Sequence, residues 1–64
     1  MDIINHKVQA LVNLGLTNES KVHSALTTAI INNPNRDPST ILEQQCALMT
    51  VKFYCGDTTY VRGV

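Results

Sequence analysis

The sequence has no long apolar run and few charges. No stretch approaches the roughly 18 continuous apolar residues that a membrane-spanning helix needs, so we expect no membrane span. Charged residues make up only 16% of the 64 residues, and the formal net charge is zero. A neutral protein gains no Coulomb attraction to nucleic acid or to an anionic membrane surface, so neither is an expected partner.

Patterns that would carry out chemistry are also missing from the sequence. The five acidic residues are scattered, and neither cysteine has a histidine near it in sequence. Gly15, Gly56 and Gly63 stand alone, so there is no glycine-rich phosphate loop. His6 and His23 lack the paired spacing of metal ligands. We therefore expect no enzyme activity, no metal site and no cofactor.

The two cysteines, Cys46 and Cys55, are nine positions apart. On one helix this spacing places them on opposite faces and about 13 Å apart along the axis, too far for a bridge within one chain. We expect two small apolar groups that are buried or half-buried. An intermolecular disulfide or a reactive thiol is the alternative.

The size of the chain predicts a single domain over residues 1–64 with apolar surface to spare. A chain this short buries only about 60% of the surface of its unfolded form, so its core is marginal. Apolar residues nevertheless make up 44% of the sequence. This combination is typical of a protein that assembles with itself or with a partner. The N-terminus lacks the basic region and apolar run of a signal peptide, which predicts synthesis and first residence in the cytoplasm.

Helical periodicity runs through the first half of the chain. A stripe containing Ile4, Val8 and Leu11 predicts a short helix over about residues 2–14, ended by Gly15. Apolar residues at i, i+3, i+4, i+7 and i+8 predict a longer helix over about residues 18–32. The first helix is too short to be stable alone and needs packing against another element.

A turn over residues 33–37 separates the second helix from a third. A residue before proline is disfavoured in the helical region, so Pro34 ends the second helix. Asp37 at the N-cap and Pro38 at the first helical position are a specific start signal for a helix over about 38–56. The tail over 57–64 is compatible with a continued helix, a short strand or disorder.

These elements predict an all-α fold, a helical hairpin of two main antiparallel helices with a short helix before it. The expected hairpin core is Val22, Leu26, Ala29, Ile30, Leu42, Met49 and Phe53. Ile41, Gln45 and Leu48 form a second stripe beside the core stripe of the third helix. Because the two stripes together are wider than one partner helix can bury, we expect the third helix to contact something further.

The turn and the third helix resemble the small needle subunits of bacterial type III secretion systems. Those subunits are helical hairpins with a Pro-x-x-Asp-Pro linker, and here the linker is Pro34-Asn35-Arg36-Asp37-Pro38. Tyr54 and the pair Val61-Arg62 fall where the family places a tyrosine and an apolar-basic pair. The related inner-rod subunits share the C-terminal pattern but are longer. Cys46, Cys55, Gly56 and Lys52 depart from the family pattern, and the family usually continues beyond the position of Val64.

The resemblance implies a self-assembling subunit of a filament through which exported proteins travel. Pro34, Asp37 and Pro38 would define the hairpin turn, and the subunit would be exported to the cell surface. Contacts between subunits, or with other secretion-system proteins, would come from Gln45, Leu48, Tyr54 and Val61. Two alternatives stay open: a cytoplasmic co-chaperone of the needle subunit, and an unrelated small helical dimerisation module.

Overall fold

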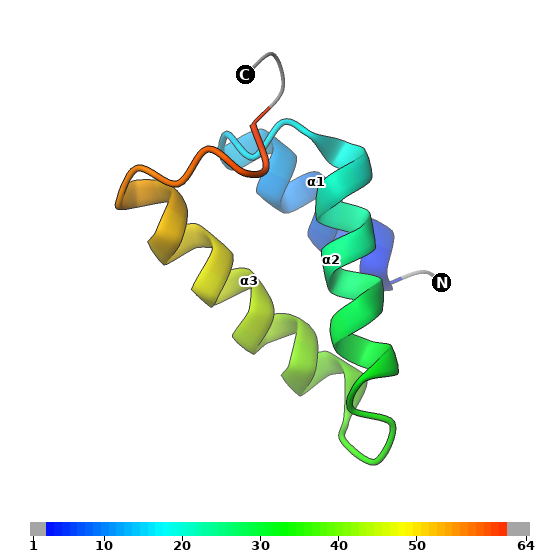
Figure 1. The fold of residues 1–64 in the computed structure, drawn as a ribbon. Coiled ribbons are helices and arrows are strands. Elements are labelled where there is room, and N and C mark those ends of the chain that lie inside the picture. Colours follow the sequence, from blue (N-terminus) through cyan, green and yellow to red (C-terminus); the bar gives the residue numbers. More distant parts are fainter. Residues whose placement is uncertain (1–2, 62–64) are drawn as a thin grey trace.

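The described part of the chain, residues 3–61, folds into three helices. The computed structural model describes residues 3–61 as α1 (Ile3–Leu14), α2 (Glu19–Ile31) and α3 (Pro38–Tyr54), with no strand in that range. The all-α prediction is therefore confirmed. Figure 1 shows α2 and α3 converging at the segment that joins them and diverging towards their other ends. α1 packs against both, so the molecule has three helices around one core.

The end of α1 is fixed by a glycine in a conformation that other residues rarely adopt. Gly15 has φ +137°, and its N–H donates to the Val12 carbonyl at 3.2 Å. The next N–H, that of Leu16, reaches back to the Leu11 carbonyl at 3.0 Å. This pair of bonds is the Schellman arrangement, which satisfies carbonyls that the helix end leaves free. The turn also directs Leu16 into the core, where it is fully buried.

Side chains of asparagine close both ends of α2. The Asn18 side chain accepts a hydrogen bond from the Lys21 N–H at 3.3 Å and is the N-cap of the helix. At the other end, Asn32 is the C-cap, and Asn33 Nδ2 donates to the Ala29 carbonyl at 2.7 Å. These bonds replace part of the intrahelical bonding that every helix end lacks.

Asp37 and Pro38 begin α3. The Asp37 carboxylate accepts a hydrogen bond from the Thr40 N–H at 3.2 Å, and Pro38 follows in the first turn, where its missing N–H costs nothing. α3 ends at Tyr54, two residues before the predicted end. Gly56 (φ +103°) and the bond from the Asp57 N–H to the Lys52 carbonyl form a second Schellman arrangement there.

The core draws on all three helices rather than on α2 and α3 alone. Of the predicted core residues, Val22, Leu26, Leu42 and Met49 are buried, whereas Ala29, Ile30 and Phe53 are only partly buried. α1 and the residues after it supply the rest of the core: Val8, Leu11 and Leu16. Residues 1, 2 and 62–64, including parts of the predicted first helix and tail, lie outside the described residues.

Ile41 belongs to the core, although the sequence analysis placed it on the second stripe of the third helix and outside the hairpin core. It is buried, with 4% of its surface exposed. Ile41 lies in the first turn of α3, next to the segment where α2 and α3 converge (Figure 1). Burial therefore changes along the second stripe: Ile41 is buried, whereas Leu48, two turns later, is exposed.

Among the described residues, one buried side-chain polar atom has no hydrogen-bond partner. The Oγ1 of Thr27 on α2 is buried and makes no hydrogen bond with any described residue. An unpaired buried hydroxyl costs free energy, whereas a methyl group in its place does not. We expect Thr27→Val to raise the free energy of unfolding by about 1 kcal/mol, measured by chemical denaturation. The control is Thr28→Val at an exposed neighbour, and an equal gain in both variants would contradict the explanation.

Candidate interaction surface

The second half of α3 carries an apolar surface that no described residue covers. Leu48, Val51 and Tyr54 are 48%, 59% and 70% exposed. They lie three residues apart along the helix, which keeps them on one side of it. We call these three residues the α3 outer face. Exposed apolar groups that cluster in this way mark interaction sites more often than scattered ones do.

The sequence analysis placed two of these three residues at a candidate interface and missed the third. Leu48 and Tyr54 were predicted as contacts, and Val51 was not. Val51 lies between Leu48 and Tyr54 at helical spacing, and that spacing was the available signal. It was missed because Val51 belongs to neither of the two stripes assigned to α3. The other two predicted contacts lie elsewhere: Gln45 is half-buried in a groove, and Val61 is half-buried after the end of α3.

An open groove of about 430 Å³ runs between α2 and α3 near their convergent ends. Small side chains and amides line it: Ala25, Thr28, Ala29, Asn32, Asn33 and Gln45. Its lining contains no titratable group and no thiol. Ala29, which was predicted to lie in the hairpin core, instead lines this groove.

The joining segment between α2 and α3 is solvent-exposed at each of the predicted turn-defining residues, Pro34, Asp37 and Pro38. Arg36 Nη2 donates to Gln44 Oε1 at 3.1 Å, and the Arg36 N–H donates to the Asn33 carbonyl at 3.2 Å. These bonds connect the segment to the first half of α3 and to the end of α2.

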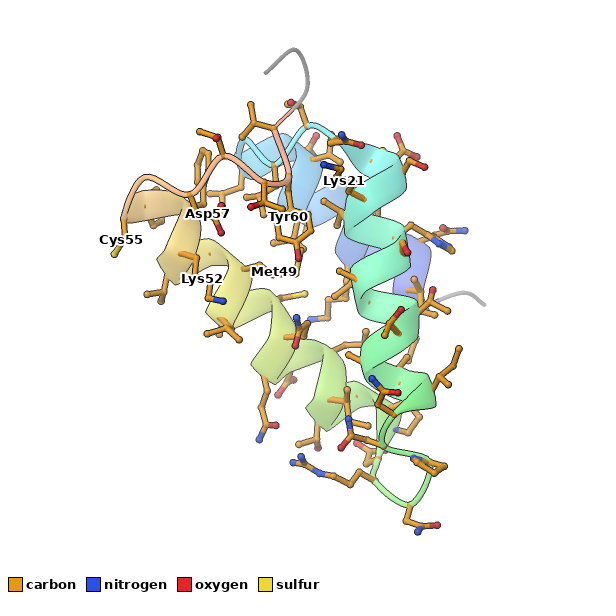
Figure 2. All side chains as sticks on the ribbon, viewed as in Figure 1. Lys21, Met49, Lys52, Cys55, Asp57 and Tyr60 are labelled. Carbon is orange, nitrogen blue, oxygen red and sulfur yellow. The ribbon has the colours of Figure 1, made fainter. Side chains whose placement is uncertain are left out.

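The two cysteines have different environments, and both are free thiols. Cys46 is half-buried; burial raises the pKa of its thiol, and the charge of Lys7 offsets part of that rise. A thiol with a raised pKa is a poor nucleophile at neutral pH. Cys55 is exposed, which corrects the expectation that it would be buried or half-buried. Figure 2 shows it pointing away from Met49 at the end of α3.

Asp57 closes a tight turn just after α3. Its Oδ1 accepts hydrogen bonds from the Thr59 hydroxyl at 2.5 Å and the Thr59 N–H at 2.9 Å. These bonds favour the ionised carboxylate and lower the pKa of Asp57, the hydroxyl bond contributing most. Because the pKa is lowered on folding, the stabilisation is present above the pKa of the unfolded chain and is lost as the pH falls through the folded value.

The pKa of Asp57 can be tested through Thr59. We expect Thr59→Ala to raise the Asp57 pKa back towards its usual value, because the hydroxyl bond is lost. An NMR titration of the side-chain carboxyl carbon measures this directly. Thr58→Ala removes a neighbouring exposed hydroxyl and is the matched control. Equal pKa values in the wild type and Thr59→Ala would show that the hydroxyl bond does not stabilise the carboxylate.

Two kinds of site are not found among the described residues. Within residues 3–61, no group of three or more His, Cys, Asp and Glu side chains could hold a metal ion. No helix in the same range has the length and apolar content to cross a membrane. Comparison with protein-family models, with curated proteins and with solved structures found no match to this chain.

Proposed function

We propose that this protein is a non-enzymatic structural subunit that assembles with other copies of itself through the α3 outer face. The proposal rests on the observation that Leu48, Val51 and Tyr54 are exposed together on one helix. Burying large apolar side chains is the main favourable contribution to protein association. With a formal net charge of zero, copies of the chain do not repel one another strongly.

The more specific proposal is a needle-like subunit of a type III secretion apparatus, made in the cytoplasm and exported. In this proposal α2, the joining segment and α3 form the hairpin unit, and Asp37 and Pro38 fix the direction in which α3 leaves the turn. The assignment rests on the resemblance of residues 34–38 and of the helix that follows, since no family model matches the chain. The hydrogen bond from the Thr40 N–H to the Asp37 carboxylate, which caps α3, supports the role of Asp37 in setting the start of this helix.

Electron microscopy of the concentrated protein tests the proposal. We expect filaments from the wild type and none from Leu48→Glu or Val51→Glu, because a charge on the α3 outer face would have to be desolvated on assembly. Ile31→Glu is the matched control: Ile31 is 68% exposed but lies on α2. A wild type that stays monomeric at high concentration, or loss of filaments in all three variants alike, would contradict the proposal.

A cytoplasmic co-chaperone of a needle subunit is the second candidate. The observation that favours it is the burial of Val8 and Leu11, because α1 closes the core and leaves a small folded body with one uncovered apolar face. One such face is sufficient to bind a single partner. Co-purification from the native operon separates the two functions, since a stable heterocomplex of defined size supports the co-chaperone. A homodimer without further partners would instead support an unrelated dimerisation module.

A further inference from the structure

The segment after α3 folds back on the start of α2. We call residues 57–61 the C-terminal strap. Figure 1 shows the strap crossing from the end of α3 to the connection between α1 and α2, at the end where α2 and α3 diverge. The contact is direct, because the Asn18 N–H donates to the Tyr60 carbonyl at 2.8 Å. This bond joins residues 42 positions apart, so no local sequence pattern predicts it.

Tyr60 is the side chain that holds the strap against the helices. It is half-buried and packs against the edge of the core. In Figure 2 its ring is directed between α2 and α3, towards Met49. The rest of the strap is held by short-range bonds: Thr59 to the Asp57 carboxylate, and the Val61 N–H to the Thr58 carbonyl at 3.1 Å. The strap can therefore keep its own turns whether or not it contacts Asn18.

Gly56 has the features of a hinge for the strap. It has φ +103°, and a Cβ at its position would have no atom within 4 Å. No atom therefore packs where a Cβ would lie, and the bond from the Asp57 N–H to the Lys52 carbonyl, which spans Gly56, is the bond that opening has to break. Gly15, which also has a positive φ, differs because the Phe53 ring lies against it.

We propose that the C-terminal strap opens and closes about Gly56 as a unit, while the three helices stay folded. When it closes, Tyr60 covers the wide end of the core and its carbonyl binds the Asn18 N–H. When it opens, that N–H and the edge of the core become accessible to solvent. Segments with few buried contacts open below the free energy of global unfolding, which is the physical basis of the proposal. It does not depend on the proposed function.

Native-state hydrogen exchange of the full chain, followed by NMR, tests the strap through two neighbouring amides. The Asn18 amide reports on the strap. The Val22 amide, which donates to the Asn18 carbonyl at 3.0 Å, reports on fraying of the first turn of α2. In the wild type we expect the Asn18 amide to be protected, but at least about tenfold less than the Leu26 amide in the middle of α2.

The variant Tyr60→Ala sharpens the test. It should lower the protection of Asn18 by about tenfold or more and leave that of Val22 nearly unchanged. Thr58→Ala, at an exposed strap residue, is the matched control and should change neither. The proposal is overturned if Asn18 and Leu26 in the wild type exchange with the same opening free energy and the same denaturant dependence. Equal loss of protection at Asn18 and Val22 in Tyr60→Ala would also overturn it.

Discussion

Replacing Leu26 by alanine is expected to remove a large part of the free energy of unfolding of this small protein. Leu26 has no exposed surface, and it contacts a core to which all three helices contribute. Removing a buried leucine side chain costs about 2–5 kcal/mol, through lost apolar burial and the cavity left behind. At about 0.05–0.15 kcal/mol per residue, the 64 residues have a total stability of about 3–10 kcal/mol.

Met49→Ala tests the same core from α3. Met49 is 2% exposed, so we expect a loss of about 2–4 kcal/mol in the free energy of unfolding, measured by urea denaturation followed by circular dichroism. Leu48→Ala, one residue earlier on the outer face of α3, is the control and should change stability by less than about 1 kcal/mol. If Leu48→Ala destabilised as much as Met49→Ala, the assignment of the two faces of α3 would be wrong.

The stripes of α2 and α3 that these variants test were predictable from the sequence. Val22 and Leu26 recur at helical spacing on the apolar stripe of α2, and Leu42 and Met49 recur on the first of the two stripes of α3. Helix starts were also predictable where a side chain caps the backbone, as at Asp37. Such signals are local, since the capping atom and the N–H that it binds are within three residues of each other.

The contribution of α1 to the core could not be derived in the same way. A 12-residue helix is marginal alone, so its order depends on packing that its own pattern does not specify. Leu16 was missed because it lies between Gly15, which was predicted to end the first helix, and the predicted start of the second helix at about residue 18. A signal was present, because the residue after a Schellman glycine commonly makes an apolar contact with the last turn.

The site was harder to predict than the core. Exposure of Leu48 and Tyr54 depends on which side of α3 its neighbours cover, and the two apolar stripes of this helix left that choice open. Ile41 and Leu48 belong to one stripe but differ in burial, because α2 and α3 converge at one end only. The bond from Asn18 to Tyr60 has no local signal at all.

Gly15→Ala is expected to be more damaging than the same change at the other helix-ending glycine. At Gly15 a new Cβ would lie 2.7 Å from Cζ of Phe53, and φ is +137°. The substitution therefore strains the backbone, at about 1–3 kcal/mol, and also displaces the Phe53 ring, for a total of about 2–4 kcal/mol. Gly56→Ala carries the backbone strain alone, because its Cβ would meet open space. Thermal or urea unfolding of the two variants measures the difference.

A double-mutant cycle separates the steric part of the Gly15 effect from the backbone part. Phe53→Leu shortens the side chain that a Cβ at residue 15 would meet, so the Gly15→Ala change should cost less in the Phe53→Leu background than in the wild type. We expect a coupling of about 1 kcal/mol, which is typical of residues in direct contact. The strain from φ +137° remains in both backgrounds. If the costs of Gly15→Ala in the two backgrounds were equal, backbone strain alone would account for the need for glycine, and the close approach of Phe53 would contribute nothing.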